Sequence, residues 1–142
     1  MKKDIVIFDL DGTLADIEQR RKISVKVNGK MDWDKFFDPN NISLDQPNIP
    51  VIKTAQALSE QGLKIVIFSG RSKATKDATK DWLDKFEVPF SVLKMRPTGN
   101  QFQFMPDDKL KKMWLEDLFP DDQKDRILCI FDDRQKVVDM WR

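Results

Sequence analysis

Four short apolar runs stand out from the otherwise polar pattern of the 142-residue chain. They cover residues 4–8, 63–68, 90–93 and 126–131. Runs of this length that are rich in β-branched and aromatic residues predict β-strands rather than helices. Because the runs are nearly continuous rather than alternating with polar residues, we expect a parallel sheet that is covered on both faces.

Helical spacing of apolar residues fills the segments between the runs. A first helix should follow Pro50, a residue favoured in first turns, and end at Gly62. Others should span residues 73–86, start at Pro106 and close the chain near residues 137–141. The alternation predicts a doubly wound α/β fold, a three-layer sandwich whose four core strands lie in spatial order 4-1-2-3. Ligands in such folds bind at the carboxyl ends of the strands.

Residues 16–48 do not follow this alternation. They hold a candidate strand at residues 23–27 and three aromatic residues, Trp33, Phe36 and Phe37. The segment is too short for an ordinary second domain, so we predict a single domain with a lid-like insertion after the first strand. The aromatic side chains could stack on a base, but we expect them to form a small core of the lid.

The residue types that the chain lacks exclude more kinds of catalysis than its net charge does. The formal net charge is +1, so affinity for nucleic acid or membranes is not predicted from charge, and any binding patch must be local. The chain has no histidine, which excludes Ser-His-Asp and Cys-His catalysis and histidine-bound zinc. Carboxylates, lysine, arginine and hydroxyls remain, and oxygen ligands suit Mg²⁺. A single cysteine and no membrane-length apolar run predict a cytoplasmic protein.

Two acidic pairs follow predicted strands. Asp9 and Asp11 come after the first run, and Asp132 and Asp133 come after the fourth. Clustered carboxylates are costly unless a positive charge compensates them. Acidic turns can instead be solvated helix caps, but two pairs at strand ends favour a shared site. We therefore predict a Mg²⁺ site at this edge of the sheet.

Four motifs, in chain order, resemble those of the haloacid dehalogenase-like phosphatases: residues 9–13 (Asp-Leu-Asp-Gly-Thr), residues 69–71 (Ser-Gly-Arg), Lys111 and Asp132-Asp133. The chain is also similar to the 3′-phosphatase domains of bacteriophage polynucleotide kinases. That similarity rests on residues 9–15, Arg20, residues 65–71 and residues 107–111, and especially on residues 132–134 with 137–142.

The resemblance implies a division of roles among the acidic residues. Asp9 would attack phosphorus and become phosphorylated, while Asp11 would protonate the leaving alcohol and later activate water. Mg²⁺ would bind the Asp9 carboxylate, the Asp11 backbone carbonyl and the last pair, chiefly Asp132 but also Asp133. Lys111 would supply positive charge to the transferring phosphoryl group.

The resemblance also implies phosphate- or substrate-binding residues. The hydroxyls of Thr13 and Ser69 and the amide of Gly70 would donate to phosphoryl oxygens. Arg20 and Arg71 could bind the phosphate or the substrate backbone, because guanidinium forks match phosphate. The alternative for Arg20 is an exposed lid residue.

Asp107 occupies a matching position one helical turn before Lys111. It could orient that lysine, or it could be an ordinary acid in a first helical turn. The apolar stripe of this helix would leave Lys111 off the buried face and free to reach the site.

We therefore predict a Mg²⁺-dependent phosphomonoesterase that removes 3′-phosphates from nucleic-acid ends. The alternatives are a phosphatase of free nucleotides or other small metabolites, and a non-catalytic module that binds phosphorylated ends. No glycine pattern forms a kinase phosphate-binding loop. The expected partner is a phosphorylated nucleic-acid end or nucleotide and not a membrane. Origin in a virus or bacterium is expected from the resemblance, and an open sheet edge beside the fourth strand would allow a dimer.

Overall fold

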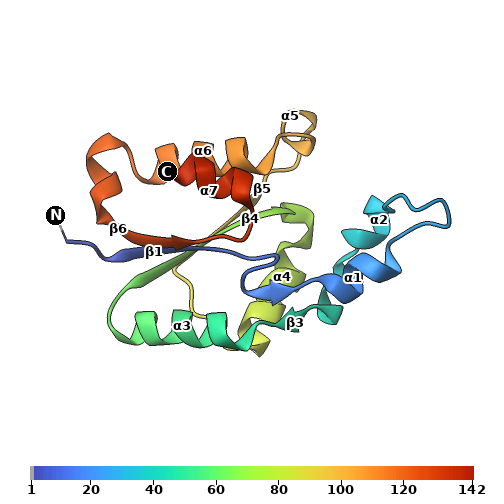
Figure 1. Cartoon of the computed structure of the whole chain (residues 1–142), viewed down its shortest axis with the longest axis horizontal. Coiled ribbons are helices and arrows are strands. Elements are labelled where there is room, and N and C mark those ends of the chain that lie inside the picture. Colours follow the sequence, from blue (N-terminus) through green and yellow to red (C-terminus); the bar gives the residue numbers. More distant parts are fainter. Residues whose placement is uncertain (1) are drawn as a thin grey trace.

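The central feature of the fold is a four-stranded parallel sheet (Figure 1). The computed structural model describes residues 2–142, except for the side chains of Asn100 and Asp122. The strands are β1 (Ile5–Asp9), β4 (Lys64–Ser72), β5 (Val92–Arg96) and β6 (Ile127–Phe131). Their order across the sheet is β5-β4-β1-β6. Numbered one to four along the chain and read from the β6 edge, this order is 4-1-2-3. The predicted order is therefore confirmed.

Helices cover both faces of the sheet, so the predicted three-layer sandwich is also confirmed (Figure 1). One layer holds α3 (Ile49–Glu60) and α4 (Lys76–Lys85), and the other holds α6 (Asp107–Leu118) and α7 (Gln135–Trp141). Side chains of β1 alternate between the layers, because successive residues of a strand point to opposite faces. Val6 and Phe8 pack in the core on the α3 side, and Ile5 and Ile7 pack in the core on the α6 side.

The insertion between β1 and α3 differs from the prediction. The predicted strand at residues 23–27 is wrong, because helix α1 runs to Ile23 and Val25 makes only a single bridge to Met31. The apolar side chains of this stretch are exposed, at 48% for Val25 and 110% for Val27, so no core is available to support a strand. The insertion contains β2 (Ala15–Asp16), α1 (Glu18–Ile23), α2 (Trp33–Phe36), the 3₁₀ turn η1 (Pro39–Leu44) and β3 (Gln46–Pro47), with β2 and β3 paired antiparallel.

Short helical segments complete the chain: η2 (Lys73–Thr75), α5 (Asn100–Gln103) and η3 (Asp121–Arg126). The predicted helix at residues 73–86 therefore begins as a 3₁₀ turn, where the Ser72 hydroxyl accepts a hydrogen bond from the Ala74 amide. Within residues 2–142, no helix has both the length and the apolar character needed to cross a membrane.

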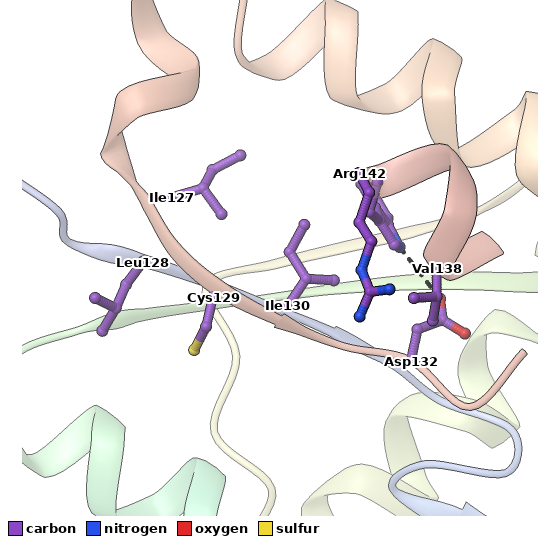
Figure 2. A pocket seen from close by; sticks show the side chains of 8 residues that line it. Ile127, Leu128, Cys129, Ile130, Asp132, Val138 and Arg142 are labelled. Carbon is purple, nitrogen blue, oxygen red and sulfur yellow. Dashed lines mark hydrogen bonds between the residues drawn. The ribbon is translucent and has the colours of Figure 1, made fainter. Parts of the chain in front are cut away.

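Strand β6 lies at an edge of the sheet, as expected. Figure 2 shows Ile127 and Ile130 on the side that faces α7, where a pocket of about 330 Å³ lies between the strand and that helix. Leu128 is 46% exposed. A dimer through this edge stays a prediction.

Candidate active site

The carboxyl ends of β1 and β6 bring the predicted nucleophile and the second acidic pair to the same level. Asp9 ends β1, and Phe8 pairs with Phe131 of β6, so Asp132 follows β6 where Asp9 ends β1. Lys111 of α6 joins them, because its Nζ donates to Asp9 Oδ1 at 2.8 Å and to Asp132 Oδ2 at 3.0 Å. Trp141 of α7 donates from its Nε1 to the same Asp132 oxygen at 3.5 Å.

Carboxylate oxygens of Asp9, Asp132 and Asp133 all lie within 4.8 Å of one another. Lys111 pairs with two of these carboxylates, Asp9 and Asp132. Three carboxylates with one ammonium carry more negative than positive charge, so the site could accept a divalent cation. An all-oxygen donor set fits Mg²⁺. We call these four residues the acidic cluster.

The surroundings of Asp9, the predicted nucleophile, make its ionisation costly. Burial raises the pKa of Asp9 well above its ordinary value and neighbouring Asp132 adds to the shift, although Lys111 opposes it. Burial alone would lower the pKa of Lys111, but Asp9 and Asp132 outweigh burial and raise it. A buried ammonium that stays charged fits a role in balancing phosphate charge.

Asp11 points away from this cluster and into a second one. Its Oδ1 accepts from Arg71 Nε at 2.9 Å and from Arg20 Nη2 at 3.3 Å. Asp45 accepts from the same arginines, at 2.9 Å from Arg20 Nε and 2.7 Å from Arg71 Nη2. Burial alone would raise the pKa of Asp11, but Arg71 and then Arg20 outweigh it and lower the pKa. We call Asp11, Arg20, Asp45 and Arg71 the arginine cluster.

Arg20 and Arg71 are 0% and 1% exposed, so the alternative of an exposed Arg20 is wrong. Their remaining donors are also engaged, because Arg20 Nη1 donates to the Phe36 carbonyl and Arg71 Nη1 to the Thr79 hydroxyl. This geometry favours a role in holding Asp11 over free contact with a substrate. Phosphate binding by either arginine stays a prediction.

The sequence analysis missed Asp45, which lies at the end of η1 and is 1% exposed. Its backbone carbonyl also accepts from Trp82 Nε1 at 2.9 Å, which fixes the end of the insertion to α4. No local sequence signal marks Asp45, because its need as a second acid follows only from the burial of the two arginines, which the fold decides.

Ser69 and Gly70 lie in β4 beside the acidic cluster, at the site edge of the sheet. The buried Ser69 hydroxyl accepts from the Arg71 amide at 3.2 Å. A side chain at Gly70 would lie 2.6 Å from the Asp107 carboxylate, so only glycine fits this approach. Ser69 and Gly70 both line the cleft, so a hydroxyl and a residue without a side chain border it at this point.

Asp107 and Lys111 differ from what the sequence suggested. Asp107 accepts from Arg96 at 2.6 Å and from Arg134 at 2.7 Å, and no hydrogen bond joins it to Lys111 among the described residues. Lys111 is 1% exposed, so the prediction that it lies off the buried face is wrong. Its long apolar stem can pack within the core while its ammonium reaches Asp9.

The turn after β1 depends on Gly12 and Thr13. Gly12 has φ 85°, and a side chain there would collide with the Asp133 carboxylate. The Thr13 hydroxyl donates to Asp9 Oδ2 at 3.1 Å, so it holds the second oxygen of the predicted nucleophile. Donation by Thr13 to a phosphoryl oxygen stays a prediction.

Both clusters border one cleft of about 1530 Å³. The insertion forms part of its wall, the segment from Arg96 to Asp107 forms another part, and Asp9, Asp11 and Asp133 line it. Residues 3–142 match the model of the protein family described as "Polynucleotide kinase PNKP phosphatase domain".

The chain belongs to this family. As a PNKP-type phosphatase domain it is a haloacid dehalogenase-like phosphatase, as its four motifs predicted. A similar protein from Autographa californica nuclear polyhedrosis virus is named "Putative bifunctional polynucleotide kinase/RNA ligase". The two are 30% identical over 140 residues, which are 96% of this chain and 17% of the viral protein.

Solved structures agree with this assignment. A chain of a Pnkp1/Rnl/Hen1 complex is 28% identical, with a TM-score of 0.71 over 99% of this chain and 42% of that one. A chain of the Pnkp1/Rnl/Hen1 RNA repair complex is 29% identical, with a TM-score of 0.71 over 97% of this chain and 38% of that one. A "predicted phosphatase" from Clostridium acetobutylicum shares the fold at 15% identity, with a TM-score of 0.69 over 99% of this chain and 80% of that one. The PNKP-type domain thus spans less than half the length of the viral protein and of the two Pnkp1 chains.

Proposed function

We propose that this PNKP-type domain is a Mg²⁺-dependent phosphomonoesterase that removes 3′-phosphates from nucleic-acid ends through an aspartyl-phosphate on Asp9. The observation that carries the proposal is the geometry of the cleft, where Asp9 lies with Lys111, Asp132 and Asp133, and Asp11 lines the same cleft. The names of the relatives, a polynucleotide kinase/RNA ligase and an RNA repair complex, support a nucleic-acid end as the substrate.

In the first step, a carboxylate oxygen of Asp9 forms a bond to phosphorus as the bond from phosphorus to the 3′ oxygen of the sugar breaks. Asp11 gives its proton to that oxygen. In the second step, water attacks the aspartyl-phosphate, Asp11 takes the water proton, and inorganic phosphate leaves with Asp9 restored. Bound at Asp9, Asp132 and Asp133, Mg²⁺ would supply charge neutralisation for the phosphoryl oxygens.

The other residues hold these groups or bind the phosphate. Lys111 balances charge on the phosphoryl oxygens, and the Ser69 hydroxyl and Gly70 amide donate to them. Arg20 and Arg71 act through Asp11, because their donors already engage carboxylates, a carbonyl and a hydroxyl. Each would orient the Asp11 carboxyl toward the leaving oxygen.

The test is a substrate panel with purified protein and Mg²⁺. It compares 3′-phosphorylated oligonucleotides with 5′-phosphorylated ones, mononucleotides and sugar phosphates. We expect the highest kcat/KM for the 3′-phosphorylated oligonucleotides. Preference for a mononucleotide or a sugar phosphate would overturn the substrate assignment, and turnover equal to that of Asp9→Asn would favour a binding module.

A further inference from the structure

The exposed aromatic side chains of the described residues share one location. Trp33, Phe37 and Phe104 are 59%, 37% and 86% exposed, and all three line the cleft that holds the acidic cluster. The other large exposed apolar side chains are aliphatic, and none lines this cleft: Ile23, Val25, Val27, Ile49 and Leu128. Aromatic exposure is therefore concentrated beside the catalytic groups rather than scattered over the surface.

These aromatic residues come from two separate walls of the cleft. Trp33 belongs to α2 and Phe37 follows it directly, whereas Phe104 follows α5. Figure 1 shows α2 and α5 at the same end of the molecule, beyond the carboxyl end of β1. A chain entering the cleft would therefore pass between aromatic side chains from two elements.

The α2 wall has a firm base. Phe36 is 6% exposed and lies under the Arg20 guanidinium, 4.4 Å from its ring centre. The expected role in a small lid core therefore fits Phe36 but not its neighbours. The rings of Trp33 and Phe37 stack at 5.8 Å with 20° between their planes, and both side chains line the cleft. Phe36 and Arg20 connect this surface to Asp11.

The charges of the cleft indicate how a nucleic acid would be held. Four arginines line it, but Arg71 and Arg96 are engaged by carboxylates, and Arg134 pairs with Asp107. Acidic residues are more numerous: Asp9, Asp11, Asp16, Glu18, Asp34, Asp38, Asp107 and Asp133. Such a wall offers few cations for a phosphate backbone, so the bases must provide much of the attraction.

We propose that Trp33, Phe37 and Phe104 form a stacking platform for the unpaired bases next to the 3′-phosphate of a single-stranded nucleic acid. The platform rests on the proposed function, because that function fixes the phosphate at Asp9. Clefts that hold one drug-sized ligand measure about 300–1,000 Å³, so a cleft of 1530 Å³ has room for more than one nucleotide. Aromatic rings accept any base, so the platform would be tolerant of sequence.

Binding without turnover provides the direct test. In the Asp9→Asn protein, a 3′-phosphorylated single strand with 2-aminopurine at its last two positions should lose fluorescence on binding, because the bases stack. Trp33→Leu and Phe104→Leu should each raise Kd by about 5- to 150-fold, while Trp33→Phe should retain most of the affinity. Both positions are exposed, so these changes should leave folding intact.

Val27→Ala is the matched control, because Val27 is exposed but does not line the cleft. It should leave Kd unchanged. The dependence of Kd on salt should be shallow, because few phosphates would be neutralised. Unchanged Kd and quenching in both leucine variants, or equal affinity for a blunt duplex, would overturn the platform.

The two proposals can fail separately. Quenching that depends on Trp33 and Phe104, without hydrolysis of 3′-phosphates by the unsubstituted protein, would keep the platform and overturn the 3′-phosphatase. Hydrolysis of 3′-phosphates that both leucine variants retain in full, without quenching, would keep the phosphatase and overturn the platform.

Discussion

Asp9 and Asp11 are two residues apart, yet their surroundings shift the pKa values of their carboxyl groups in opposite directions. Asp9 shares one lysine with two further carboxylates, and its pKa is raised. Asp11 faces two arginines that a fourth residue, Asp45, partly neutralises, and its pKa is lowered. In the metal-free protein both directions oppose the proposed roles, because a nucleophile must be ionised and a general acid protonated. Binding of Mg²⁺ beside Asp9 and of the phosphate beside Asp11 would have to reverse them.

The largest effect should come from removing each carboxylate in turn. Asp9→Asn should abolish turnover, because it removes the attacking oxygen. Asp11→Asn should lose about 10²–10⁴-fold in rate through the loss of proton transfer. It also removes one of the two carboxylates that pair with Arg20 and Arg71. After acid quenching of a reaction with ³²P-phosphorylated substrate, Asp11→Asn protein should carry label and Asp9→Asn protein none.

A nitrophenyl phosphate should show a smaller loss in Asp11→Asn, because that leaving group needs no proton. Asp4→Asn is the control, since Asp4 pairs with Arg126 away from the cleft. Equal labelling of the Asp9 and Asp11 variants would contradict the assignment of the nucleophile.

Substitution of Asp45 tests the arginine cluster while Asp11 itself stays unchanged. Asp45→Asn would leave two buried arginines with Asp11 as their one carboxylate partner in the cluster, and removing one partner of a buried pair costs about 3–5 kcal/mol. Urea unfolding should show this loss, while Asp4→Asn, in a partly exposed pair, should change the stability little.

The kinetic effect of Asp45→Asn should appear in kcat more than in KM, because it displaces Asp11 and leaves the aromatic cleft wall in place. Asp45→Glu should recover part of kcat. A variant that is as stable and as active as the unsubstituted protein would show that Asp45 is not needed to hold the arginines.

The smallest effects should appear in the stability of the metal-free protein. The pKa of Asp9 is higher in the folded protein than in the unfolded chain, where it is about 4. As pH rises from about 4 through the folded pKa, the unfolded chain releases this proton more easily, so the folded state loses stability. Asp9→Asn should therefore raise the free energy of unfolding at neutral pH, by about 0.5–2 kcal/mol. Asp11 has the opposite sign: its lowered pKa adds stability above about pH 4, which is lost as pH falls.

Thermal unfolding across pH, with and without Mg²⁺, measures both signs. Mg²⁺ at a hundred times its Kd should add about 2.7 kcal/mol to the unsubstituted protein and to Asp11→Asn, but less to Asp9→Asn. Equal stabilisation of all three proteins would argue against metal binding at Asp9.

The apolar runs predicted the sheet and its helix layers because strand burial on two faces leaves a pattern that is local in sequence. The acid pairs after two of these runs predicted a shared site, and three of the four carboxylates do gather there. The Asp11 carboxylate instead pairs with Arg20 and Arg71. Arg20 and Asp45 could not be found in this way, because their burial depends on partners 25 residues apart and on Arg71 beyond them. Arg20 stands in a basic run whose next residue, Arg21, is exposed, so composition alone does not separate them.

The pairing of β1 with β4 and β6 also bears on how the chain folds during synthesis. Ile5 lies beside Lys64 on one side and Ile127 on the other, so the central strand is made first and gains its last neighbour late. Contacts between such distant segments slow folding, because a long loop must close before they form. On the ribosome, a nascent chain that has emerged as far as α4 would hold Asp9, Asp11 and both arginines, but neither Lys111 nor Asp132. Until β6 is made, one edge of the apolar β1 has no neighbouring strand. A chaperone or another chain could bind this exposed edge before β6 pairs with it.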